Sequence, residues 1–155
     1  MIRIEIPGRE ALEIAHVVLD YNGTIAVDGA LLPPVRQRLE QLKEVVEIHV
    51  LTADTYGTVQ EQCRMPSVAV HTFPRAGAAA CKAEIVSALE GGVACFGNGF
   101  NDIPMFSLAA LSVAVLEGEG LCAQLLTQAD VLVTSAADGL DLLLKPDRLR
   151  ATLRS

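Results

Sequence analysis

Short apolar runs alternate along the chain with segments whose apolar residues recur at helical spacing. The apolar runs and the alternating stretch at the start predict strands at 2–6, 15–19, 46–51, 68–70, 93–96, 112–116 and 131–133. Helical spacing and stop signals predict helices at 35–45, 58–63, 76–89, 101–109, 121–127 and 136–144, with a short polar helix after Pro146. The strands 2–6 and 15–19 are expected to pair as a hairpin.

Strands that alternate with helices indicate an α/β fold with a doubly wound, Rossmann-like parallel sheet. In such sheets ligands bind outside the carboxyl ends of the strands, near the point where the strand order reverses. The polar residues just after the apolar runs are Asp20, Thr52 and the Gly97-Asn98-Gly99 turn with Asp102. These residues are therefore the candidates for a binding site.

Composition is consistent with this fold. The chain has 155 residues, of which 51% are hydrophobic and 20% charged, and its mean hydropathy is +0.38. This length and composition predict a single domain over residues 1–155 and exclude a disordered chain. Aromatic residues make up only 4% of the chain, so the core must be aliphatic, as is typical of parallel sheets covered by helices.

Charge and cysteine content exclude several classes of function. The net charge is −7 without a cluster of Lys or Arg, so neither nucleic acid nor an anionic membrane is expected as a partner. The longest apolar stretch, 103–116, contains Pro104 and is shorter than the roughly 20 residues that span a bilayer. The start of the chain lacks the pattern of a signal peptide, so a cytoplasmic protein is expected. The four cysteines form no C-x-x-C motif and are expected to be buried, reduced thiols.

Single residues leave more than one interpretation open. Asp20 follows a predicted strand and precedes Asn22-Gly23-Thr24, which suits phosphate binding but also an ordinary turn. Thr52 is also explained as a helix N-cap, and Lys82 as a solvated surface lysine. The histidines are expected to be interior or edge residues of strands rather than ligands: His16, His49 and His71.

Four motifs in order are more informative than any one of them. They are DYNGT from Asp20, TAD from Thr52, the lysine of Lys82-Ala-Glu-Ile85-Val86, and GNGFND from Gly97. This set resembles the haloacid dehalogenase superfamily, and most closely the phosphorylation domain of P-type ATPases, which has DKTGT, TGD, a Lys before Ile-Val, and GDGxND. The similarity covers residues 14–145, including Gln128-Ala-Asp-Val-Leu-Val133, which is similar to a later ATPase strand.

The resemblance implies Mg²⁺-dependent phosphoryl transfer through an aspartyl-phosphate. On this interpretation Asp20 is the nucleophile, Thr52 donates its hydroxyl to the transferred group, and Lys82 supplies a positive charge. The implied Mg²⁺ ligands are the Asp20 carboxylate, the Asn22 backbone carbonyl, and Asn98 and Asp102 of the GNGFND loop. The implied phosphate-binding residues are Gly23, Thr24, Ala53 and Asn101.

Two positions depart from the family pattern. Asn22 stands where phosphatases of the family have a second Asp, and an amide cannot do general acid–base work, which is worth about 10² to 10⁴ in rate. Asn98 replaces the first acid of GDGxND and removes one negative ligand from the metal site. A slow phosphohydrolase with weakened Mg²⁺ affinity is expected. The alternatives are a non-catalytic or regulatory protein that binds a phosphorylated ligand or partner protein, and transfer of the phosphoryl group to an acceptor other than water.

The spacing of the motifs excludes large inserted domains. Asp20 and Thr52 are only 32 residues apart, which leaves no room for the nucleotide-binding domain of the ATPases, and no large cap domain is expected. A small flap is predicted at 25–32, with Asp28-Gly29 as its hairpin turn. Family members without a cap either oligomerise to cover the site or act on large phosphorylated molecules. A phosphorylated small molecule, a phosphoprotein and a homo-oligomer therefore all stay open as partners.

Overall fold

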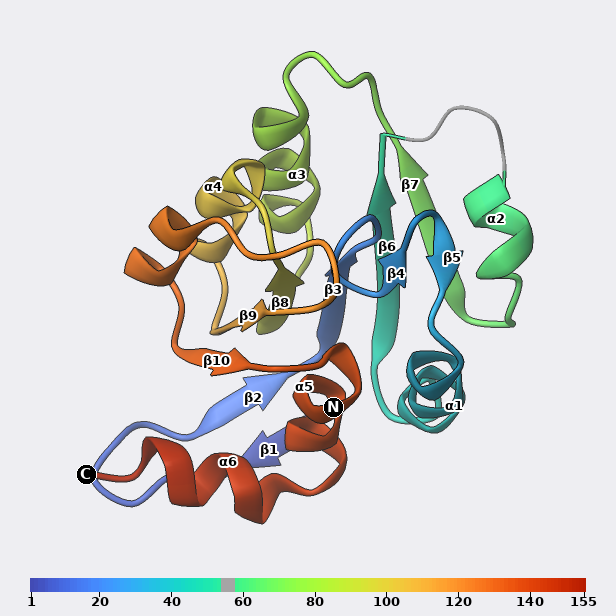
Figure 1. The fold of residues 1–155 in the computed structure, drawn as a ribbon. Coiled ribbons are helices and arrows are strands. Elements are labelled where there is room, and N and C mark those ends of the chain that lie inside the picture. The colour runs from blue at the N-terminus through green and yellow to red at the C-terminus, as the bar shows by residue number, and fades with distance from the viewer. Residues whose placement is uncertain (54–57) are drawn as a thin grey trace.

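The computed structural model of the chain describes residues 1–53 and 58–155, and six parallel strands form its central sheet (Figure 1). Their spatial order is β10 (Val131–Val133), β9 (Leu111–Val115), β8 (Val93–Gly97), β3 (His16–Asp20), β6 (Glu47–Thr52) and β7 (Val68–Thr72). The chain runs outward from β3 to β7, returns to β8 beside β3, and runs outward again to β10. The predicted doubly wound α/β fold is confirmed, and its order reverses between β3 and β8.

Helices cover both faces of this sheet. One face carries α1 (Pro33–Leu42), α2 (Thr58–Gln62), α5 (Ala136–Leu144) and α6 (Pro146–Leu153). The other face carries α3 (Ala78–Ser87), α4 (Ile103–Phe106) and the 3₁₀ turns η1 (Phe100–Asp102) and η2 (Ala123–Thr127). Val17 and Leu19 of β3 pack in the first apolar cluster and Val18 packs in the second, as the alternation of side chains along a strand requires.

The predicted hairpin between residues 2–6 and 15–19 is wrong. β1 (Ile2–Ile4) pairs antiparallel with β2 (Leu12–Ile14) in a separate two-stranded sheet. β3 has no free edge for such a pairing, because β6 and β8 occupy its two sides. Ile4 and Ile14 are fully buried on the face of α1 and α5, so the small sheet extends the core beyond the end of the main one.

Further differences concern the type of helix and the ends of elements. The predicted helix 101–109 is the 3₁₀ turn η1 followed by the four-residue α4, and the predicted helix 121–127 is the 3₁₀ turn η2. α1 begins at Pro33, two residues before the predicted start, because proline fits the first turn of a helix, where its missing N–H is not needed.

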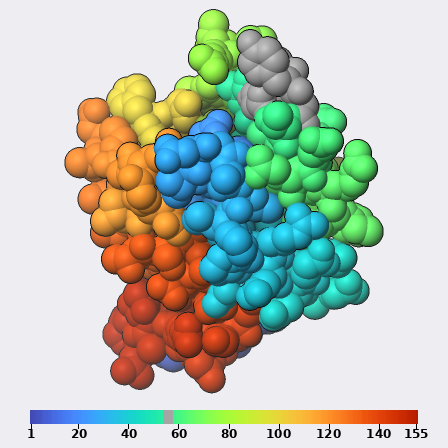
Figure 2. Space-filling view, turned by 45° about the vertical axis from the view of Figure 1, so that its right-hand side comes forward, coloured from blue at the N-terminus to red at the C-terminus, as the bar shows by residue number. Residues whose placement is uncertain are grey.

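The hairpin predicted at residues 25–32, with Asp28-Gly29 as its turn, forms and is called the flap below. β4 (Ala26–Val27) and β5 (Ala30–Leu31) pair antiparallel, and Asp28 and Gly29 between them have φ of 52° and 80°, as a tight two-residue hairpin requires. The amide of Gln62 in α2 donates to the Gly29 carbonyl at 2.9 Å, and the Asp28 N–H donates to Glu119 at 3.2 Å. Figure 2 shows the flap, in blue, at the surface between the green segment that contains α2 and the orange segment after β9.

Two further expectations concern cysteines and membrane segments. All four cysteines are free; Cys63 and Cys95 are buried, whereas Cys81 and Cys122 are partly exposed. Burial raises the pKa of Cys63 to about 11. No helix within residues 1–53 and 58–155 combines the length and hydrophobicity needed to cross a membrane.

An ion pair joins two helices on the same face. Arg38 of α1 donates from Nε to Asp141 Oδ1 at 2.9 Å and from Nη2 to Asp141 Oδ2 at 3.1 Å, and the Asp141 side chain is only 7% exposed. This fork geometry holds the pKa of Asp141 below its usual range, and Lys145 and Arg148 lower it further.

We predict that Asp141→Asn lowers the free energy of unfolding by about 2 kcal/mol at pH 7, because it removes a charged, bidentate hydrogen-bond acceptor. The folded-state pKa of Asp141 lies below the unfolded one, so its stabilising effect is complete above about pH 4 and disappears as the pH falls through the folded-state pKa. Urea unfolding from pH 3 to 7 measures this difference. The matched control is Asp147→Asn, whose side chain is 93% exposed and whose loss should have little effect. A difference between wild type and Asp141→Asn that persists unchanged at pH 3 contradicts the prediction.

Candidate active site

Lys82 of α3 lies at the centre of a polar cluster at the carboxyl ends of the strands. Its ammonium donates to Asp20 Oδ1 at 2.8 Å, to Asp102 Oδ1 at 2.8 Å and to Asn101 Oδ1 at 2.7 Å. These three bonds use all three ammonium hydrogens, and the residue is only 2% exposed. The interpretation of Lys82 as a solvated surface lysine is therefore wrong.

Asp20 is the last residue of β3, beside the point where the strand order reverses. Its Oδ2 accepts a hydrogen bond from the Thr24 hydroxyl at 3.0 Å. Burial and the nearby Asp102 raise the pKa of Asp20 to about 7, although Lys82 and Thr24 oppose the shift. Burial alone would lower the pKa of Lys82, but Asp20 and Asp102 together raise it above its ordinary value. The protonation of the Asp20 carboxylate thus depends on the adjacent Lys82. An Asp that only forms a turn needs no such buried cation, so the interpretation of Asp20 as an ordinary turn residue does not explain these contacts.

Asp102 is fixed from the opposite side by the loop after β8. It is fully buried, and its Oδ2 accepts hydrogen bonds from the backbone N–H groups of Asn98 at 3.2 Å and Gly99 at 3.0 Å. A Cβ at Gly97 would lie 2.5 Å from the carboxyl carbon of Asp102. Glycine at the end of β8 therefore lets the loop fold back over this carboxylate.

A second set of contacts ties the loop after β3 to the loop after β8. The Thr24 hydroxyl also lies 3.1 Å from Asn98 Oδ1, and Asn98 Nδ2 donates to the Gly120 carbonyl at 3.1 Å. Gly23 has a φ of 80°, and a Cβ there would overlap the Asn98 side-chain amide. Thr24 thus connects Asp20 to Asn98, and Gly23 permits the two loops to approach.

A cavity of about 250 Å³ opens above these residues. Its lining consists of Asp20, Asn22, Thr52, Ala53, Phe73, Ala78, Lys82, Asn98, Gly99 and Asn101. Of the residues predicted from the sequence, Gly23, Thr24 and Asp102 do not line the cavity; they are buried behind the residues that do. Thr52 is the last residue of β6, and Ala53 after it is in neither a helix nor a strand, so Thr52 is not the N-cap of a helix. Asp54 of the TAD motif lies outside the described residues.

Sequence reasoning missed two residues of the lining, Phe73 and Ala78. Phe73 directly follows β7, so the rule that ligands bind at the carboxyl ends of strands indicates it once β7 is extended to Thr72. Ala78 is the first residue of α3 and carries no chemical signal in the sequence.

The donor set fits a hard divalent cation. The polar atoms beside the cavity include the carboxylates of Asp20 and Asp102 and the side-chain oxygen of Asn98. Among the lining residues that the structure describes, none carries sulfur or imidazole. Two carboxylates and one ammonium leave a net negative charge when all three are ionised. Oxygen ligands with such a charge are those that Mg²⁺ prefers.

A known protein family matches the second half of the chain, and solved structures match its fold. Residues 82–139, which include Lys82 and the GNGFND loop, match a family described as haloacid dehalogenase-like hydrolase. The uncharacterized protein MJ0072 of Methanocaldococcus jannaschii is 54% identical over 39 residues, which are 25% of this chain and 89% of that protein.

Solved structures resemble the whole fold. The cobalt-bound deoxy-D-mannose-octulosonate 8-phosphate phosphatase of Haemophilus influenzae superposes with a TM-score of 0.69 at 12% identity, covering 92% of this chain and 94% of that one. The 3-deoxy-D-manno-octulosonate 8-phosphate phosphatase of Moraxella catarrhalis, solved with magnesium and phosphate ions and the sugar acid, gives 0.66 at 17% identity, covering 91% and 94%. At these identities the likeness extends to the fold alone.

We predict that Lys82→Met lowers the free energy of unfolding by about 3–5 kcal/mol in metal-free buffer, because two buried carboxylates lose their shared counter-charge. Mg²⁺ should restore part of the loss. Chemical unfolding with and without Mg²⁺ measures both effects. Lys145→Met, at a side chain that is 56% exposed, is the matched control and should change stability little. Equal stabilities of the two variants would show that Lys82 does not hold the carboxylates together.

Proposed function

We propose that this chain, which belongs to the haloacid dehalogenase-like hydrolases, is a Mg²⁺-dependent phosphohydrolase that works through an aspartyl-phosphate on Asp20. The observation that carries the proposal is the buried Lys82 ammonium bound to both Asp20 and Asp102 beside an open cavity. This arrangement places a positive charge beside a carboxylate that lines the cavity, at the edge of the sheet where a ligand of a parallel sheet binds.

Asp20 is the proposed nucleophile. One carboxylate oxygen attacks phosphorus, an Asp20 oxygen–phosphorus bond forms, and the bond from phosphorus to the leaving oxygen breaks with its electron pair on that oxygen. A water molecule then attacks phosphorus, which releases inorganic phosphate and regenerates Asp20. Lys82 and the Thr52 hydroxyl stabilise the negative charge of the transferred group, and Thr24 keeps Asp20 in position through its hydrogen bond.

The residues that would hold Mg²⁺ are Asp20, the backbone carbonyl of Asn22, Asn98 and Asp102. Bound there, the ion supplies positive charge that offsets the charge of the phosphoryl oxygens. Ala53 and Asn101 line the same cavity and are proposed to contact the phosphate, whereas Gly23 shapes the loop behind it.

The proposed reaction is slow because Asn22 cannot donate a proton. Asn22 is exposed and lines the cavity two residues after the nucleophile, where a carboxylic acid would protonate the leaving oxygen and activate water. Without that acid, substrates whose leaving group is stable as an anion should react best, and the phosphoenzyme should persist.

We propose a phosphorylated small molecule as the substrate. The small cavity and the short flap suit a compact phosphate ester, and the phosphatases with similar folds are named for a phosphorylated sugar acid. A phosphoprotein remains the second candidate because the hairpin of β4 and β5 is too short to enclose the site. A homo-oligomer that covers the site would favour the small molecule.

One observation favours a different function, the binding of a phosphorylated ligand without turnover. The Asn98 amide donates to the Gly120 carbonyl and contacts Thr24, so the residue that replaces a family acid is built into the loop structure. A binding protein whose pocket has adapted to asparagine would show this feature.

Phosphate release from para-nitrophenyl phosphate and acetyl phosphate separates the two functions. Wild type should show slow release that requires Mg²⁺, Asp20→Asn should show none, and Asn22→Asp should raise the rate about 100-fold because it restores a general acid and base. No release by wild type or by Asn22→Asp, with Mg²⁺ present, would contradict the phosphohydrolase and favour the binding protein.

Asn98→Asp adds a negative oxygen ligand and should lower the Mg²⁺ concentration needed for half-maximal phosphate release about tenfold. The same change removes the amide that donates to Gly120, so we expect the metal-free protein to be less stable and Mg²⁺ to raise its melting temperature more than in wild type. An unchanged Mg²⁺ requirement would place the ion away from Asn98.

A further inference from the structure

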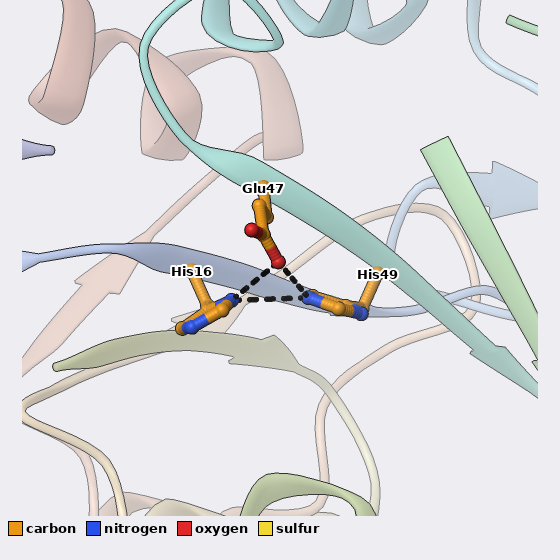
Figure 3. A group of neighbouring side chains, drawn as sticks. All are labelled: His16, Glu47 and His49. Carbon is orange, nitrogen blue, oxygen red and sulfur yellow. Dashed lines mark hydrogen bonds and ion pairs between the residues drawn. The ribbon is translucent and has the colours of Figure 1, made fainter. Parts of the chain in front are cut away.

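A second cluster of ligand-bearing side chains lies at the opposite end of the sheet from Asp20. Figure 3 shows His16 of β3 and Glu47 and His49 of β6 with their polar atoms turned toward one another. His16 and Glu47 are the first residues of their strands, and His16 is four residues before Asp20, which places the two clusters about 13 Å apart along β3. Nothing in the phosphohydrolase mechanism uses these side chains.

Strand register brings the three side chains together. His16 pairs with Glu47 across the parallel strands, so both side chains lie on the same face of the sheet. His49 is two residues after Glu47 and therefore lies on that face as well. The pairing of β3 with β6 fixes the backbone of all three residues, so their side chains reach a common point by rotation of side-chain bonds alone.

The distances match those between ligands of one metal ion. His16 Nδ1 lies 3.2 Å from His49 Nε2 and 3.3 Å from Glu47 Oε2, and His49 Nε2 lies 3.9 Å from Glu47 Oε2. The point in the plane of these three atoms that is equidistant from them is about 2.0 Å from each, which is the length of a Zn–N or Zn–O bond. Tetrahedral coordination requires the exposed Glu47 carboxylate to move closer to His49 Nε2 than 3.9 Å. We propose that His16, His49 and Glu47 bind a Zn²⁺ ion, independently of the phosphohydrolase site.

The outer contacts of the two histidines support this assignment. His16 Nε2 lies 3.0 Å from the Glu90 carbonyl, which accepts its N–H and leaves Nδ1 with a free lone pair toward the site. His49 Nδ1 lies 3.1 Å from His71 Nε2. When His49 binds the ion through its own Nε2, its Nδ1–H can therefore donate to His71 Nε2. A metal-bound histidine usually donates its other N–H to such a partner, which fixes the tautomer and the orientation of the ring.

Burial and charge also suit a divalent ion. The His16 and His49 side chains are 10% and 9% exposed, whereas that of Glu47 is 73% exposed and gives an ion access from solvent. Two imidazoles and one carboxylate are a ligand set that Zn²⁺ takes in tetrahedral geometry, with a fourth position left for water.

Without metal, the histidines form a row of hydrogen bonds. His71 donates to His49, His49 donates to His16, and His16 donates to the Glu90 carbonyl. Each ring nitrogen that lies between two of these groups has a hydrogen-bond partner in this row. The row alone therefore accounts for the three residues as interior and edge histidines of the strands. Glu47 adds a carboxylate oxygen beside both rings that this row of hydrogen bonds does not need, whereas a metal ion would use it.

Isothermal titration of the metal-free protein with Zn²⁺, in excess Mg²⁺, tests the proposal. We expect one Zn²⁺ per chain in wild type and equally in Asp20→Asn, whose active site is altered. Glu47→Ala should weaken binding at least tenfold. Glu44→Ala removes another exposed glutamate three residues earlier and should leave binding unchanged.

Visible absorption of the Co²⁺ form identifies the ligands. A tetrahedral site with nitrogen ligands gives intense bands, whereas an octahedral oxygen site absorbs weakly. The bands should be present in wild type and Asp20→Asn and absent in His16→Gln and His49→Gln. If those buried variants do not fold, the exposed pair Glu47→Ala and Glu44→Ala decides. Zn²⁺ binding that Asp20→Asn abolishes, or that Glu47→Ala leaves at full affinity, would overturn the proposal, as would no binding by wild type.

Discussion

The ammonium of Lys82 holds together two carboxylates that would otherwise repel each other inside the protein. Asp20 comes from β3 and Asp102 from the loop after β8, so this contact also joins the two strands where the sheet reverses its order. A buried cation is costly without partners, and Lys82 avoids that cost by using all three hydrogens on oxygen acceptors. The position of α3, the close fold of the loop at Gly97 and the charge of the proposed nucleophile all depend on this arrangement.

Because the strands of the sheet are parallel, its two ends carry different sets of polar side chains. Oxygen ligands and a cation gather at the carboxyl ends of the strands, where loops can vary without disturbing the core. Imidazoles and one carboxylate gather at the amino ends of β3 and β6, where strand pairing alone sets their spacing. Hard cations suit the first set and Zn²⁺ the second, so one sheet offers two sites that differ in the metal they prefer.

Much of the fold could be predicted because alternating apolar runs and helical spacing reflect burial directly. The rule that ligands bind at the carboxyl ends of strands selected Asp20, Thr52 and Asp102 before any resemblance was used. Other features depend on pairing that a single sequence does not encode locally. The partner of β1 was predicted wrongly because Leu12-Glu13-Ile14, which alternates as Ile2-Arg3-Ile4 does, is only three residues long and runs directly into the stronger apolar segment 15–19. Thr24 was predicted to bind phosphate; its hydroxyl contacts Asp20 and Asn98, a pairing that depends on two loops far apart in the sequence. The resemblance to P-type ATPases and the single domain stay predictions.

In the proposed reaction Asp20 carries the phosphoryl group. Incubation with acetyl phosphate and Mg²⁺, followed by borohydride reduction, converts an aspartyl-phosphate to homoserine, and peptide mass spectrometry locates the changed residue. We expect homoserine at position 20, in an amount raised by the slow hydrolysis that Asn22 imposes. Phosphate release without modification of Asp20, or a modified residue elsewhere in the chain, would contradict it.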